Sequence, residues 1–196
     1  MLIEMFADPV LNAMARRRSV SKVGPHTPTD EDIAELLAAV TPVADHKALR
    51  PWRLILMRGD DRMALAHALD EAQGITRKNG EYNTKPFRAE LLIAVIASPT
   101  WHPAVPDWEQ HATAAGAGHL LELALWQSGW GVMWRTGIYA NTEPVRAAHG
   151  LAANEHLMGW LYVGDIDESF RRRLLESKKP PLDPEQFLSR MPAHGA

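Results

Sequence analysis

Two helices are predicted near the start of the chain from the spacing of its hydrophobic residues. Asp8 and Pro9 form a typical helix start, an N-capping carboxylate followed by a proline at the first helical position. The apolar stripe of this short helix is Val10, Leu11 and Met14. A second helix begins after Thr29, because Thr29 and Asp32 have the spacing of a capping box. Its apolar positions recur at helical intervals: Ile33, Leu36, Leu37 and Val40.

Strands alternate with helices in the middle of the chain. The apolar run 52–57 predicts a strand that stops at Gly59, and the helix after it extends to Gly74. The apolar positions of that helix are Met63, Leu65 and Leu69. The polar segment 78–85 predicts a loop, and the uninterrupted apolar run 91–97 predicts a buried strand.

The longest predicted helix runs from about Trp108 to Ser128 and is rich in small residues, including Gly116 and Gly118. Small side chains allow another helix or a flat ligand to approach the backbone closely, and both uses remain open. The rest of the pattern predicts a strand at 131–135, a helix from Thr142 to near Gly150 and a last strand at 157–163. The pattern therefore predicts four strands and about five helices.

Composition restricts the class of protein. A chain of 196 residues with 46% hydrophobic and 23% charged residues is expected to form one globular domain. The net charge of -3 argues against nucleic acid or a membrane surface as a partner, and no run approaches the roughly 20 apolar residues of a membrane span. Residues 1–14 do not resemble a signal peptide, and cysteine is absent, so a cytoplasmic location is expected.

Three clusters carry groups that could bind a ligand. The first is the basic run that contains Arg17, Arg18 and Ser19, whose guanidinium and hydroxyl groups suit a phosphate, although a solvated basic turn is the alternative. The second is the loop 45–53, where His46, Lys47 and Arg50 could donate to a polar ring or to phosphate oxygens, or Trp52 could simply pack in the core. The third is Trp134, Arg135 and Thr136, which by themselves are also compatible with an ordinary strand end.

Other catalytic classes lack support in the sequence. His111 and His119 lie eight residues apart, without the four-residue spacing of a zinc helix, so no metal site is expected. The sequence has no nucleophile elbow, no phosphate-binding Walker loop and no dinucleotide fingerprint after a strand. We therefore expect no hydrolase, kinase or Rossmann-type dehydrogenase.

Taken in order, these segments resemble the nitroreductase family, in particular its short bacterial branch of candidate NAD(P)H nitroreductases. The matching runs are RRRSVSK at 16–22, ADHKALRPWR at 44–53, VPDWEQ at 105–110, WRTG at 134–137 and GWLYVG at 159–164. The run DHK-x-x-x-PWR is the most specific of them. The resemblance implies an α+β fold in which helices surround a mixed central β-sheet, assembled as an intertwined homodimer with FMN between the chains. It places the FMN-binding domain at 1–165 and leaves 166–196, which is polar and broken by prolines, as an extended C-terminal arm or tail.

The same resemblance assigns roles to individual residues. Arg17, Arg18 and Ser19 would hold the flavin phosphate and ribityl chain, and His46 would approach the flavin from the other chain. The remaining cofactor-binding positions that we expect are Pro42, Arg50, Trp134, Arg135 and Thr136. Pro42 departs from the family, because a basic side chain is typical there and proline has no side-chain donor. Lys22 stands where an arginine is usual, and Asp165–Ile166 stands where a proline is typical.

The expected activity is an FMN-dependent oxidoreductase that uses NADH or NADPH to reduce small electrophilic acceptors, such as nitroaromatics or quinones, in a ping-pong cycle. Because the flavin carries this chemistry, no side-chain catalyst is required. A flavoenzyme of the same fold with another reaction is the first alternative. A nucleic-acid-binding module using basic patches at 16–18, 171–173 and 178–179 is a remote one.

Overall fold

The computed structural model describes residues 6–177 and 183–191. Part of the tail expected to be extended, including its basic residues Lys178 and Lys179, lies outside the described residues. Residues 1–5, the start of the segment 1–14 that does not resemble a signal peptide, also lie outside the described residues.

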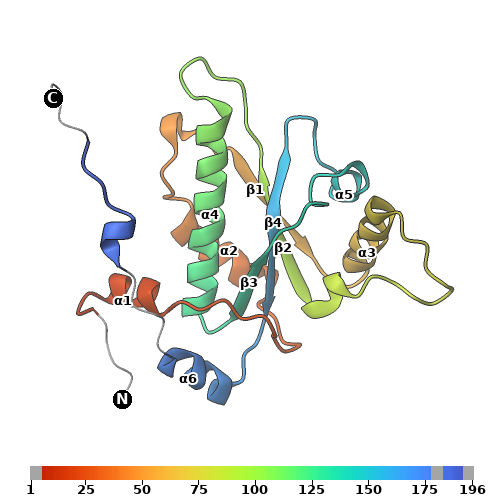
Figure 1. The fold of residues 1–196 in the computed structure, drawn as a ribbon, viewed down its shortest axis with the longest axis horizontal. Helices are drawn as coiled ribbons and strands as arrows, with labels where there is room; N and C mark the ends of the chain where they lie inside the picture. The colour runs from red at the N-terminus through yellow and green to blue at the C-terminus, as the bar shows by residue number, and fades with distance from the viewer. Residues whose placement is uncertain (1–5, 178–182, 192–196) are drawn as a thin grey trace.

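The centre of the molecule is a four-stranded sheet with the strand order β1-β2-β4-β3 (Figure 1). The strands are β1 (Trp52–Met57), β2 (Leu91–Ala97), β3 (Gly131–Arg135) and β4 (His156–Gly164). All three neighbouring pairs in the described chain are antiparallel, so the expectation of a mixed sheet is wrong for this chain. The reason is topological: β2 and β3 run in the same direction, but β4 lies between them and pairs antiparallel with both.

Helices cover both faces of the sheet, which makes the fold α+β. One face packs on α2 (Asp30–Val40) and α4 (Asp107–Gln127), and the other on α3 (Asp60–Gln73) and α5 (Glu143–Ala148) (Figure 1). Every residue of β2 is buried because both faces are covered, as its uninterrupted apolar run predicts. Its alternate side chains enter two separate cores: Leu92, Ala94 and Ile96 on the α3 side, Leu91, Ile93 and Val95 on the α4 side.

The predicted helix starts are confirmed by their hydrogen bonds. The Asp8 carboxylate accepts the main-chain N–H groups of Val10 and Leu11 at the start of α1 (Pro9–Arg16). At α2, the N–H of Asp32 donates to the Thr29 hydroxyl at 3.1 Å, and the N–H of Thr29 donates to the Asp32 carboxylate at 2.8 Å. Both caps pair N–H groups that a helix start otherwise leaves without partners.

The C-terminal segment contains a helix that the sequence analysis did not predict, α6 (Glu168–Glu176). Asp167 caps it by accepting the N–H of Phe170 at 2.9 Å, and Asp167 is the signal that could have revealed it. Arg171 anchors α6 to the end of α4 by donating to the Trp126 carbonyl at 2.8 Å. None of the described helices has the length and apolarity to cross a membrane.

The two glycines of α4 make room for side chains of the same chain. A Cβ built on Gly118 would lie 2.5 Å from the Trp134 ring, and one on Gly116 would lie 3.1 Å from Val43. The backbone of α4 therefore approaches β3 and the loop after α2 closely. The small residues at these two positions serve packing within the chain.

Candidate functional site

A pocket of about 350 Å³ opens at the exit of β3, on the face of the sheet that carries α3 and α5. Trp134, Arg135 and Thr136, the third cluster of the sequence analysis, all line it. The other lining residues come from α3, the turn before β2, the loop after β3, and β4: Leu69, Lys85, Arg88, Gly137, Tyr139, Ala140, Trp160 and Tyr162, with Met133 of β3. Aromatic rings and cations thus surround one opening at the sheet edge.

The charge of this pocket is positive, because its lining includes Lys85, Arg88 and Arg135 but no carboxylate. The guanidinium of Arg135 lies 5.3 Å from the centre of the Tyr162 ring, and its Nε is buried without a hydrogen-bond partner among the described residues. Burial raises the pKa of the Tyr162 hydroxyl, while Arg135 and Arg88 act in the opposite direction. An oxyanion would complement this lining.

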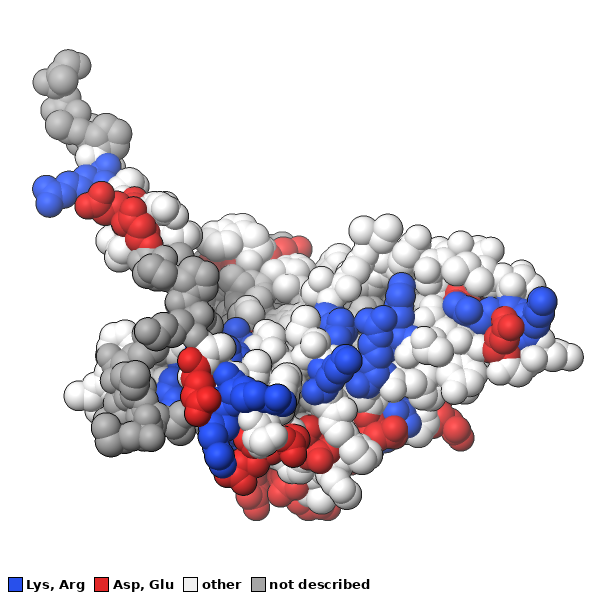
Figure 2. All heavy atoms as spheres, turned by 60° about the horizontal axis from the view of Figure 1, so that its bottom comes forward, with Lys and Arg blue, Asp and Glu red and all other residues white. Residues whose placement is uncertain are grey.

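Positive charge is gathered on part of the molecular surface, despite the net charge of -3. Figure 2 shows a face on which Lys and Arg side chains form a band, while Asp and Glu side chains collect along one margin. The overall charge therefore does not predict the charge of a particular surface.

The Trp134 side chain is wedged between α4 and β4. Its indole Nε1 donates to the Met158 carbonyl at 3.2 Å, and its ring lies 4.7 Å from the His119 ring. Gly159, with a φ of +136°, leaves the space that the indole occupies, since a Cβ there would lie 2.3 Å from Nε1. The end of β3 is therefore held rigidly where the pocket begins.

A buried histidine positions one wall of the pocket. The indole Nε1 of Trp160 donates to Nε2 of His149 at 2.9 Å, and Nδ1 of His149 lies 2.7 Å from the Val145 carbonyl. A carbonyl can only accept, so Nδ1 carries the hydrogen and the ring is neutral in this arrangement. Burial lowers the pKa of His149 and so favours the same neutral form, while the hydrogen bond to the Val145 carbonyl acts in the opposite direction.

The first cluster lies along the edge of β3 and against α4. The N–H of Val20 donates to the Val132 carbonyl at 2.8 Å, which aligns this segment with β3. Arg17 donates to the Ser19 hydroxyl and to the buried Glu122 carboxylate, both at 3.2 Å. Arg17 and Ser19 are therefore adjacent, as a shared phosphate site requires, and Glu122 supplies a counter-charge that sequence reasoning missed.

Arg18 ties the end of α1 to the end of α6. Its guanidinium donates to the carbonyls of Ala15 and Arg17 at 3.1 Å and to that of Ser177 at 3.2 Å. Its Nε is buried and has no partner among the described residues. Arg18 thus has a structural role as well as one unsatisfied donor.

A second cavity of about 330 Å³ lies between α1, the end of α4 and α6, with Arg16 and Arg171 in its lining. The Arg171 guanidinium stacks 4.7 Å above the Trp126 ring, and burial followed by the charge of Arg16 lowers its pKa. Its bond to the Trp126 carbonyl satisfies the C-terminus of α4, so helix capping accounts for Arg171 here.

The second cluster lies at the other end of α4. His46 Nδ1 is 2.8 Å from the Glu109 carboxylate, and Pro42 and Arg50 are both exposed nearby in the chain. Glu109 and Glu122, which contact His46 and Arg17, are thirteen residues apart on one helix, a rise of about 20 Å. Within one chain the structure does not bring His46 together with Arg17.

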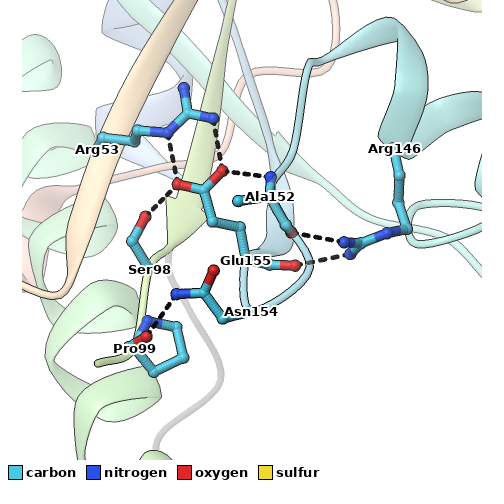
Figure 3. A network of polar contacts seen from close by, with 7 residues as sticks. All are labelled: Arg53, Ser98, Pro99, Arg146, Ala152, Asn154 and Glu155. Atoms are coloured by element: carbon cyan, nitrogen blue, oxygen red, sulfur yellow. Dashed lines mark hydrogen bonds and ion pairs between the residues drawn. The ribbon is translucent and has the colours of Figure 1, made fainter. Parts of the chain in front are cut away.

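Arg53, which ends the most specific matching run, belongs to a structural network (Figure 3). Its guanidinium forms two 2.7 Å hydrogen bonds with the Glu155 carboxylate, which also accepts the Ser98 hydroxyl at 2.7 Å and the N–H of Ala152 at 3.0 Å. These contacts lower the pKa of Glu155 to about 2, with Arg53 the largest cause, and raise the pKa of Arg53. This network joins β1 to the loop before β4.

Sequence reasoning missed two pocket residues: Lys85, which ends the polar segment 78–85 predicted to be a loop, and Arg88, which lies between that loop and the strand predicted at 91–97. Their position just before the buried strand β2 is the signal that could have revealed them, since residues next to the end of a central strand lie where the sheet ends. Across the described ranges, no group of three His, Asp or Glu side chains could hold a metal ion.

Known proteins match this chain in sequence and in its α+β fold. The nitroreductase family model matches residues 14–165. A curated relative, the candidate NAD(P)H nitroreductase YdjA of Escherichia coli (strain K12), is 32% identical over 158 residues, which cover 79% of this chain and 86% of that protein. The chain therefore belongs to the nitroreductase family.

Solved structures show the same fold. A nitroreductase-like family protein from Bacillus cereus has a TM-score of 0.76 at 19% identity and covers 96% of this chain and 99% of its own. The FMN-dependent nitroreductase NfnB from Mycobacterium smegmatis, solved with NADPH, has a TM-score of 0.67 at 16% identity, with 93% and 98% covered. At these identities the likeness establishes the architecture alone.

Proposed function

We propose that this protein is an FMN-dependent oxidoreductase that uses NADH or NADPH to reduce small electrophilic acceptors, such as nitroaromatics or quinones, in a ping-pong cycle. Family membership and the relatives named for NAD(P)H, and for FMN and NADPH, support the class. The observation that carries the proposal is the pocket at the exit of β3, which has aromatic walls and cations without carboxylates.

The residues present fit a flavin mononucleotide. Its planar ring suits a pocket walled by Trp160 and Tyr162, and the carbonyl oxygens of the ring suit Arg135, whose buried Nε lacks a partner among the described residues. When bound, FMN would supply the redox chemistry by taking a hydride from NAD(P)H and passing the electrons to the acceptor.

The protein's own residues would bind and orient the cofactor. We propose that Arg17, Arg18 and Ser19 hold the phosphate and ribityl chain, because Arg17 already contacts the Ser19 hydroxyl and Arg18 keeps one buried donor that has no partner in the described part of the chain. Trp134, Arg135 and Thr136 would contact the ring, since all three line the pocket. These side chains would bind the cofactor and exclude water from it. Because the flavin would carry the redox chemistry, no side-chain nucleophile is needed.

A second copy of the chain would complete the site. His46 lies about 20 Å along α4 from Arg17, so the second cluster, with Pro42 and Arg50, can join the first only from another chain. The outer face of α4 supports this assembly, because Glu122 is the only charged residue after Glu109 in this helix and it is buried. The exposed residues that follow Asp107 in this helix are Trp108, Ala112, His119, Leu120 and Gln127. A long helix face without charged side chains is normally covered, and a second α4 would cover it here.

We further propose that residues 1–165 form the FMN-binding domain, that 166–196 act as its C-terminal arm, and that the protein works in the cytoplasm. The family match, which ends at residue 165, is compatible with this boundary.

The absorption spectrum of the purified protein tests the proposal. We expect yellow protein with flavin bands that bleach on addition of NADH or NADPH and return with a nitroaromatic or quinone, together with a light-scattering mass of two chains. Protein that stays colourless after incubation with FMN would contradict the proposal. Bleaching without reoxidation by these acceptors would support the proposed flavin but contradict the proposed class of acceptor.

A further inference from the structure

His46, in the second cluster, pairs with the carboxylate of Glu109. His46 lies in the short turn η1 (His46–Ala48) before β1, and Glu109 lies in the first turn of α4. Because an ionised carboxylate only accepts, the 2.8 Å contact places the hydrogen on Nδ1 of His46. Nε2 has no hydrogen-bond partner within the described parts of the chain and is left for a ligand.

The loop that carries His46 adopts an unusual backbone conformation. Lys47, Ala48 and Arg50 have φ values of 65°, 51° and 50°, in the left-handed region that non-glycine residues seldom adopt. The Asp45 carboxylate holds this conformation by accepting the N–H groups of Leu49 at 3.1 Å and Arg50 at 2.7 Å. Strained backbone of this kind is typical of ligand-binding segments.

The start of α4, which carries Glu109, is fixed just as firmly. The buried Gln110 side chain accepts the N–H of Thr100 at 2.9 Å and donates to the Thr100 carbonyl at 2.8 Å. Trp108 beside it is 71% exposed and points away from the core. The run 105–110 thus combines a rigid anchor, an exposed ring and the carboxylate that holds His46.

Folding stability does not account for this arrangement. The side chains of His46 and Glu109 are 45% and 31% exposed, and an ion pair this accessible contributes little. The free-energy cost of three residues with strained backbone is larger than the stabilisation that such an ion pair contributes. The arrangement is therefore better explained by orientation of the imidazole.

We propose that Glu109 is a positioning residue, which holds the His46 ring so that its Nε2 faces the flavin bound by the other copy of the chain. The proposal rests on the proposed function, because it needs an FMN site between two chains. It gives the run 105–110 a role that its sequence alone does not reveal.

Glu109→Ala and Glu109→Gln, made in the full chain, test the role of the carboxylate, with His46→Ala as the reference. Asp107→Asn is the matched control, because it removes a negative charge two residues away that does not contact the His46 side chain. Two readouts are measured: the Kd for FMN by fluorescence quenching, and the His46 tautomer by ¹⁵N NMR at about pH 8, where an ordinary imidazole is neutral. Thermal unfolding confirms that each variant is folded.

We expect Glu109→Ala to raise the Kd for FMN roughly fivefold to tenfold and to reduce the fraction of His46 with its hydrogen on Nδ1. Glu109→Gln should lose less, because its carboxamide oxygen still accepts from Nδ1, and Asp107→Asn should stay within about twofold. If Glu109→Ala keeps both Kd and tautomer while His46→Ala weakens binding, the positioning role is overturned. Wild-type protein that binds no FMN overturns the proposed function itself.

Discussion

Arg53 and Arg135 both belong to runs that match the nitroreductase family, but they have different surroundings. Arg53 forms two hydrogen bonds with a carboxylate that is only 10% exposed. Arg135 lines an open pocket without carboxylates and keeps a buried Nε without a partner within the described chain. Of these two arginines, Arg53 thus has its anion supplied by the fold, whereas Arg135 has no carboxylate partner among the described residues and is available to a ligand.

The largest expected effect separates these two arginines by stability. Arg53→Met should lower the free energy of unfolding by about 3 kcal/mol, at the low end for a buried pair because the Arg53 side chain is itself partly exposed, since it leaves the Glu155 carboxylate without its main counter-charge. Urea denaturation followed by circular dichroism measures this change. Arg172→Met is the control, since Arg172 makes only an exposed contact with Glu168 at 3.9 Å and should change stability by less than about 0.5 kcal/mol. If Arg53→Met loses no more unfolding free energy than the control, Arg53 does not have this structural role.

The same network predicts a pH dependence. The folded pKa of Glu155, about 2, lies below its ordinary value of 4.5, so the unfolded chain takes up the proton first as the pH falls. The contribution is therefore complete above about pH 4.5 and is lost as the pH falls towards about 2. Unfolding free energies of the wild type and Glu155→Gln should differ most near neutral pH, and the difference should shrink by about 3 kcal/mol across this window. A difference that is constant with pH would show that Glu155 has an ordinary pKa.

Arg135 should show the opposite behaviour, with an effect on binding and little on folding. Arg135→Met should weaken FMN binding by about 2 kcal/mol, roughly 30-fold, through loss of a charge-assisted contact. Flavin fluorescence titration measures the Kd, and Arg53→Met serves as the counterpart that should bind FMN normally once folded. Equal affinity in wild type and Arg135→Met would place the flavin away from this pocket.

Much of the fold could be predicted from the sequence because its signals are local. The capping box of Thr29 and Asp32 marks the start of α2, and the unbroken apolar run of β2 requires burial on both faces. The pairing of β4 with both β2 and β3 could not be predicted, since strand order depends on contacts between distant segments. The helix α6 was missed because its sequence is polar and its support comes from α4.

For the candidate site, the sequence by itself determined which residue types were present: the arginines and serine of the first cluster, the His46 loop, and the segment from Trp134 to Thr136. Only the tertiary structure decided how each is used. It joined the third cluster with Lys85 and Arg88 in one pocket, paired Arg53 with Glu155, and separated His46 from Arg17 along α4. The physical reason is that a charged side chain is defined by its partners, and in this fold those partners come from distant parts of the chain.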